Sequence, residues 1–143
     1  MELKELRIGN WVYDEEGICS KIIGVCDELG EDSVLIEWHP QGKPPSIECI
    51  MDANLLMPIP LSEELLLKCG FEMELSVSTS IFICKQRRDL IVQYIPEICS
   101  YIFRIKSGMG YSTFVRYIDY LHQLQNLLFA ITDEGLEVEL WSD

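Results

Sequence analysis

The stretch YLHQLQNLLFAITDEG (residues 120–135) carries the longest helical pattern in a chain made mostly of strand-forming segments. At ~100° per residue its apolar side chains gather into one stripe, which predicts an amphipathic helix that packs one face on a sheet. Asp119 is expected to cap the start of this helix, and Gly135 lies just past its end. The stripe consists of Tyr117, Tyr120, Leu121, Leu124, Leu127, Leu128 and Ile131.

The face opposite the stripe mixes polar and apolar side chains, which a purely solvated face would not do. The same projection places Ile118 and Phe129 beside the polar residues of this face. Either a second lobe of the protein covers the surface, or another molecule binds it. We therefore predict a candidate interaction or interdomain surface formed by Ile118, His122, Gln125, Asn126 and Phe129.

Residues 61–143 are expected to form an α+β domain around this helix. Ser62 is a favourable N-cap for a short helix over residues 61–70, and Gly70 is a favourable terminator. Five β-branched and aromatic segments between residues 71 and 118 predict an antiparallel meander, on which the long helix packs. Residues 136–141 predict a final short strand.

Residues 1–60 are expected to form a separate small domain that shares an interface with the first. Four short strand patterns are separated by turn signals, and residues 52–56 resemble a single helical turn. Gly24 interrupts the second pattern and predicts a β-bulge. This order of elements favours a small SH3-like β-barrel. The predicted fold class is therefore α+β, with a barrel followed by a helix, a meander, a helix and a strand.

Composition places the chain among globular proteins. It has 143 residues, of which 48% are hydrophobic, enough to bury a core. No apolar run is long enough to cross a membrane, and the charged N-terminal residues lack the apolar region of a signal peptide. We therefore expect a cytoplasmic protein that does not associate with a membrane. Its six cysteines are then expected to be reduced thiols.

Charge is distributed unevenly along the chain, whose net charge is −13. Residues 1–75 hold sixteen acidic and five basic residues, whereas residues 76–118 hold two acidic and six basic ones. The overall negative charge disfavours binding to nucleic acids, because it repels their phosphates. The basic segment with its aromatic residues nevertheless leaves one alternative, in which the sheet over residues 81–117 binds single-stranded nucleic acid by stacking.

Signatures of catalysis and of metal binding are missing from the sequence. There is no GxSxG elbow, no phosphate-binding GxxxxGK[ST] loop, no CxxC pair and no HExxH motif. The acidic pairs fall in predicted turns, where exposure to water explains them better than acid–base chemistry. We predict no catalytic residues, no cofactor and no metal site.

Three segments resemble a family of small prophage and conjugative-element proteins of Bacteroidales. They are ELRIGNWVYDEEG, LMPIPLSEELLLKCGFE and YLHQLQNLLFAITDEGLEVEL, which stand in the order of the family's LRIGN, PIPLTEEWLLKFGF and VHQLQNLYFALTGEEL motifs. Cys69 replaces a phenylalanine of the family, and Asp133 stands where glycine is usual. The resemblance implies a cytoplasmic protein that originates from a mobile element, and it transfers no functional residue.

Together these observations favour a non-catalytic protein that binds another protein. Two alternatives stay open besides this one. The acidic first half could mimic DNA as a decoy against host defence, and the sheet over residues 81–117 could bind single-stranded nucleic acid. The sequence leaves the oligomeric state open.

Overall fold

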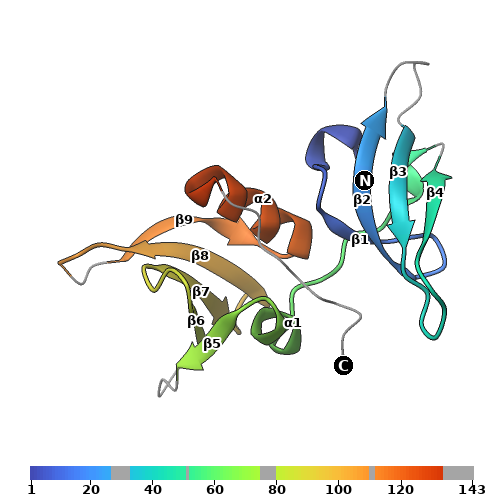
Figure 1. The fold of residues 1–143 in the computed structure, drawn as a ribbon. Coiled ribbons are helices and arrows are strands. Elements are labelled where there is room, and N and C mark those ends of the chain that lie inside the picture. Colours follow the sequence, from blue (N-terminus) through green and yellow to red (C-terminus); the bar gives the residue numbers. More distant parts are fainter. Residues whose placement is uncertain (27–32, 51, 75–79, 110–111, 134–143) are drawn as a thin grey trace. The chain divides into compact units, whose positions relative to one another are not determined.

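The computed structural model of this chain is an α+β protein with two antiparallel sheets, which confirms the predicted class (Figure 1). It describes residues 1–26, 33–50, 52–74, 80–109 and 112–133. Contacts within the chain divide it into two units. Residues 1–60 and 120–133 form what we call the four-stranded unit, and residues 61–119 form the five-stranded unit.

The four-stranded unit is built from short strands with alternating burial. Val34 and Ile36 are buried, whereas Leu35 between them is exposed, as expected for a strand with one face on the core. The register shifts between Ile22 and Gly24, which confirms the predicted bulge. The elements are Leu3–Glu5 (η1), Trp11–Tyr13 (β1), Cys19–Cys26 (β2), Ser33–Trp38 (β3), Ser46–Ile50 (β4) and Ala53–Leu55 (η2), where η marks a 3-10 helix.

The predicted SH3-like barrel is not closed in the described residues. Their sheet has the order β1-β2-β3-β4, and β1 and β4 are not paired with each other. Tyr13 and Met57 instead exchange two backbone hydrogen bonds of 2.8 Å in an isolated bridge. Because β1 has three residues, its outer edge offers a single bridge in place of a ladder. Among the described residues, the four-stranded sheet is therefore open and does not close into a barrel.

The five-stranded unit is an antiparallel meander, as the strand patterns predicted. Its strands lie in the order of the sequence across the sheet (Figure 1). Pro96 falls in the turn between two of these strands, where its missing N–H breaks no ladder bond. The strands are Phe71–Glu74 (β5), Ile81–Cys84 (β6), Leu90–Ile95 (β7), Ser100–Lys106 (β8) and Ser112–Ile118 (β9).

A short helix, Glu63–Lys68 (α1), precedes this sheet and has the predicted caps. Ser62 Oγ accepts a 3.1 Å hydrogen bond from the backbone N–H of Leu65. Gly70 has a φ of 89°, a left-handed conformation that glycine adopts without strain. Both ends of α1 are thus determined by the sequence next to them.

The long helix, Leu121–Thr132 (α2), lies with the four-stranded unit, whereas the sequence placed it on the meander. Periodicity identifies the apolar face of a helix, but it does not say which sheet receives that face. The helix begins after Tyr120 and not after Asp119, because Tyr120 has the extended N-cap conformation and its N–H donates to Gln123 Oε1. Gly135 and the predicted strand over residues 136–141 lie outside the described residues.

Candidate functional site

The polar residues predicted to form a surface on α2 attach this helix to the N-terminal segment. Gln125 Oε1 accepts a 3.0 Å hydrogen bond from the backbone N–H of Trp11, and Gln125 Nε2 donates one of 3.0 Å to the carbonyl of Gly9. Asn126 accepts a 2.8 Å bond from the side chain of Asn10 and donates one of 3.0 Å to the carbonyl of Glu5. The side-chain amides of Gln125 and Asn126 are therefore hydrogen-bonded to backbone and side-chain groups within the four-stranded unit.

The other three residues of that predicted surface differ in burial. His122 is buried, and its ring stacks on that of Tyr120 at a centroid distance of 6.0 Å. Phe129 is 43% exposed, and the guanidinium of Arg7 lies 5.4 Å from its ring centroid. Ile118 is fully buried at the end of β9, in the five-stranded unit. Among these five residues, Phe129 alone remains substantially open to solvent.

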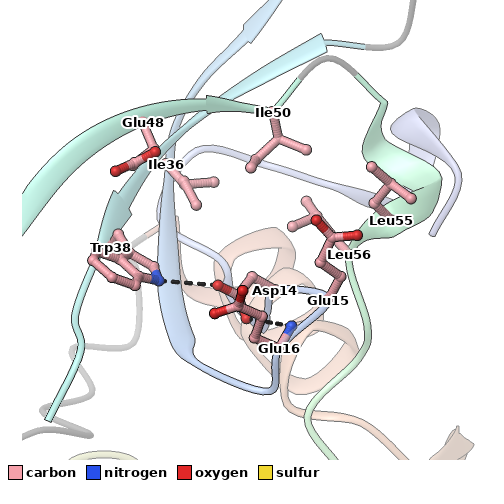
Figure 2. A pocket seen from close by; sticks show the side chains of 9 residues that line it. All are labelled: Asp14, Glu15, Glu16, Ile36, Trp38, Glu48, Ile50, Leu55 and Leu56. Atoms are coloured by element: carbon pink, nitrogen blue, oxygen red, sulfur yellow. Dashed lines mark hydrogen bonds between the residues drawn. The ribbon is translucent and has the colours of Figure 1, made fainter.

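A pocket in the four-stranded unit is a better candidate for a binding site (Figure 2). Its volume is about 290 Å³. Figure 2 shows the indole of Trp38 on one side and the side chains of Ile50 and Leu55 on the opposite side. The lining residues are Asp14, Glu15, Glu16, Ile36, Trp38, Glu48, Ile50, Leu55 and Leu56. An apolar floor with a few polar groups around it is typical of ligand sites.

The turn between β1 and β2 forms one wall of this pocket and is held by Asp14. The backbone N–H groups of Glu16 and Ile18 donate to Asp14 Oδ1 at 2.9 and 2.8 Å, which is a local side-chain turn motif. Asp14 Oδ2 accepts a 2.9 Å bond from Trp38 Nε1. One carboxylate thus orders the turn and holds the indole in place at the pocket wall.

Glu48 enters the pocket from β4, on the face of the sheet that is turned toward the core. It stands opposite Ile36 in the antiparallel register, and Ile50, two residues on, stands opposite Val34. Because alternate residues of a strand share one face, Glu48 occupies a position where the pattern calls for an apolar side chain. A carboxylate at such a position is a candidate for function.

The pocket carries negative charge that the described chain does not neutralise. Glu15, Glu16 and Glu48 are exposed, and none of them forms an ion pair with any described lysine or arginine. Residues 1–60 hold twelve acidic and four basic residues, so the field of this unit also favours cations. The arrangement can therefore hold a positively charged group above an apolar floor.

Sequence reasoning missed this pocket, although two signals for it were present. The DEEG turn at residues 14–17 was interpreted only as a solvated turn, and the structure does place a turn there. The strand at residues 46–50 alternates so that Glu48 shares a face with Ile50. The register between β3 and β4, in which Glu48 stands opposite Ile36, then locates this carboxylate on the core side.

Other reactive groups of the described chain do not form a second site. Burial raises the pKa of Cys19 to about 11 and that of Cys69 to about 12, so both thiols keep their protons at neutral pH. No cluster of His, Cys, Asp or Glu suited to a metal ion occurs among the described residues. No helix in the described ranges is both long and apolar enough to span a membrane.

The basic residues of the five-stranded unit are largely engaged with neighbours. Arg87 forms a 2.9 Å ion pair with Asp89, and Arg88 pairs with Glu72. Arg104 Nε donates a 3.0 Å hydrogen bond to Gln93. The two ion pairs reduce the positive charge that the sheet over residues 81–117 offers to a phosphate backbone.

Comparisons with protein-family models, curated proteins and solved structures found no match to this chain. The resemblance to a mobile-element family therefore stays a prediction from the sequence.

Proposed function

We propose that this chain is a non-catalytic protein-binding protein and that the pocket of the four-stranded unit is its binding site. The supporting observation is the pocket itself, where Glu48 occupies a core-facing position beside an apolar floor. We further propose that the protein acts in the cytoplasm, as its composition and the sequence resemblance both imply, and, from the resemblance alone, that it originates from a mobile element. We propose neither a membrane partner nor a cofactor for this protein.

The partner is proposed to bind as an extended segment along β4. Among the described residues β4 is paired with β3 and stands last in the order β1-β2-β3-β4, and extended segments bind such edge strands by adding to the sheet. Glu48 and Ile50 belong to this edge strand and also line the pocket. A segment that adds to β4 would therefore place one of its side chains in or beside the pocket.

We also propose that this unit is an SH3-like barrel. Four strands, the 3-10 helix η2 and the bridge between Met57 and Tyr13 follow one another in the order such a barrel requires.

Selection from a random peptide library tests the proposed function. Peptides selected on the wild-type protein should bind Leu55→Gln about tenfold more weakly, since one apolar contact of ~1.4 kcal/mol is lost from the pocket floor. Leu67→Gln is the matched control, because Leu55 and Leu67 are both 46% exposed and Leu67 lies on α1. Fluorescence polarisation with labelled peptides measures the affinities.

Two results would contradict this proposal. Selection that enriches no binding peptide would argue against recognition of extended segments. Peptides that bind wild type and Leu55→Gln equally well would place the binding site outside the pocket.

A further inference from the structure

The pocket has features that select the chemistry of its occupant. Trp38 presents an indole whose position is fixed by the hydrogen bond from Nε1 to Asp14. Glu15, Glu16 and Glu48 surround the same cavity from two different elements, the β1–β2 turn and β4. Carboxylates attract cations by charge. The pocket therefore favours a cationic ligand.

A small metal ion does not fit this arrangement. The described residues, the pocket carboxylates among them, contain no group of three His, Cys, Asp or Glu side chains close enough to hold one. Carboxylates that are spread around a cavity of about 290 Å³ suit a larger cation with its charge delocalised over several N–H groups.

The apolar floor suits the aliphatic part of the same ligand. Ile36 and Leu56 are buried in the core of the unit, and Ile50 and Leu55 line the pocket beside them. The methylene groups of a long basic side chain cover apolar surface while the charged end stays among polar groups. A guanidinium can also bind a carboxylate through two parallel hydrogen bonds and stack on an aromatic ring.

We propose that the pocket takes an arginine side chain of the protein partner. This inference rests on the proposed function and adds the chemistry of the residue that is recognised. The net negative charge of residues 1–60 favours the approach of such a basic segment. A nucleic acid is not the occupant, because its phosphates would meet the carboxylates of the pocket.

Titration with defined tripeptides tests the proposal. The probes are acetyl-Gly-Arg-Gly-amide, the lysine analogue and the analogue with citrulline, which has nearly the shape of arginine and no charge. The signal is the NMR resonance of the Trp38 indole N–H, assigned with Trp38→Phe. We expect the arginine peptide to shift this resonance with millimolar affinity, the lysine peptide to bind several-fold more weakly, and the citrulline peptide to leave it unchanged.

Charge variants locate the interaction in the pocket. Glu48→Gln should weaken binding of the arginine peptide about twofold to fivefold, the range expected for one exposed charge pair. Glu74→Gln is the matched control, because Glu74 is also an exposed strand carboxylate and lies on β5 of the other unit. The control should bind like wild type.

Each contrary outcome has a distinct meaning. Equal shifts with arginine and citrulline, equal affinities for arginine and lysine, or equal effects of Glu48→Gln and Glu74→Gln would overturn the arginine proposal. The proposed function would survive these results if library peptides still lost affinity for Leu55→Gln. Conversely, the arginine peptide could bind specifically while the library peptides have equal affinity for wild type and Leu55→Gln. That result would retain the arginine pocket and overturn the proposed function.

Discussion

Gln125 shows how one side chain can replace a missing strand partner. The backbone N–H of Trp11 is buried in β1, and the acceptor it finds is an amide 114 residues away in the sequence. A buried donor that loses its acceptor costs about 1–3 kcal/mol, because it cannot return to water. Gln125 therefore contributes to stability through a group that belongs to another element.

Gln125→Ala is expected to lower the free energy of unfolding by about 1–3 kcal/mol, since the N–H of Trp11 and the carbonyl of Gly9 both lose their partner. Gln41→Ala removes the same atoms from an exposed turn and should change stability by less than about 0.5 kcal/mol. Urea denaturation followed by circular dichroism measures both. Equal midpoints for the two variants would show that the Gln125 bonds do not stabilise the fold.

The thiols should divide into two reactivity classes. Cys49 and Cys99 are exposed, whereas Cys19 and Cys69 have pKa values raised by burial to about 11 and about 12. At pH 8 only about one in a thousand Cys19 thiols would be ionised, and fewer at Cys69. Timed alkylation with iodoacetamide and peptide mass spectrometry should therefore find Cys49 and Cys99 modified first.

The reactivity of the buried thiols should depend on pH. A raised pKa keeps the neutral form dominant up to that pKa, so alkylation of Cys19 should accelerate about tenfold per pH unit between pH 7 and 9. Fast modification of Cys19 or Cys69 at pH 7 would contradict the burial of these side chains.

At the scale of elements, the end of α2 depends on a residue in an unfavourable conformation. Asp133 has a φ of 57° and its N–H donates a 2.9 Å bond to the carbonyl of Phe129. Left-handed backbone favours glycine, and a negative charge at the C-terminal end of a helix opposes the helix dipole. Asp133 therefore terminates the helix at an energetic cost.

Asp133→Gly is expected to stabilise the protein by about 0.5–1 kcal/mol, because glycine adopts the left-handed conformation without strain and removes the charge. Asp133→Val should destabilise it by a similar amount or more, since β-branched residues resist positive φ. Thermal melts of the two variants provide the measurement. Melting temperatures that move in the same direction would rule out this account of how α2 ends.

Local elements could be predicted from the sequence, but their partners could not. Ser62 and Gly70 mark the ends of α1, and Gly24 marks the bulge in β2, because each effect acts on neighbouring residues. The attachment of α2 to residues 5–11 depends on the amides of Gln125 and Asn126, whose partners lie far away in sequence. The pocket was missed for the same reason, since it requires the register between β3 and β4.

At the scale of the whole molecule, the five-stranded unit is inserted into the four-stranded unit. Residues 61–119 leave and re-enter at adjacent points, because Pro60 and Tyr120 form a β-bridge. The backbone N–H of Leu121 also donates a 2.8 Å bond to the carbonyl of Ile59. Insertions between adjacent points are tolerated, since they change little in the host domain.

Replacement of residues 61–119 by a short Gly-Ser linker should therefore leave a folded four-stranded unit. Residues 1–60 alone should fail to fold, because the N–H of Trp11 and the carbonyl of Gly9 lose the amide of Gln125. Cooperative thermal unfolding measured by circular dichroism distinguishes the two proteins. A folded fragment 1–60, or an unfolded linker protein, would contradict the insertion.

The bridge between Pro60 and Tyr120 also has a consequence for synthesis on the ribosome. Translation completes residues 61–119 before it reaches α2, so the meander has all of its strands while the first sheet still lacks its helix. Contacts between consecutive strands are local in the chain and form early. Domains usually fold in the order in which they are synthesised, beginning at the N-terminus. Here we expect the reverse order, in which the inserted five-stranded unit folds first and the four-stranded unit, which contains the N-terminus, folds last.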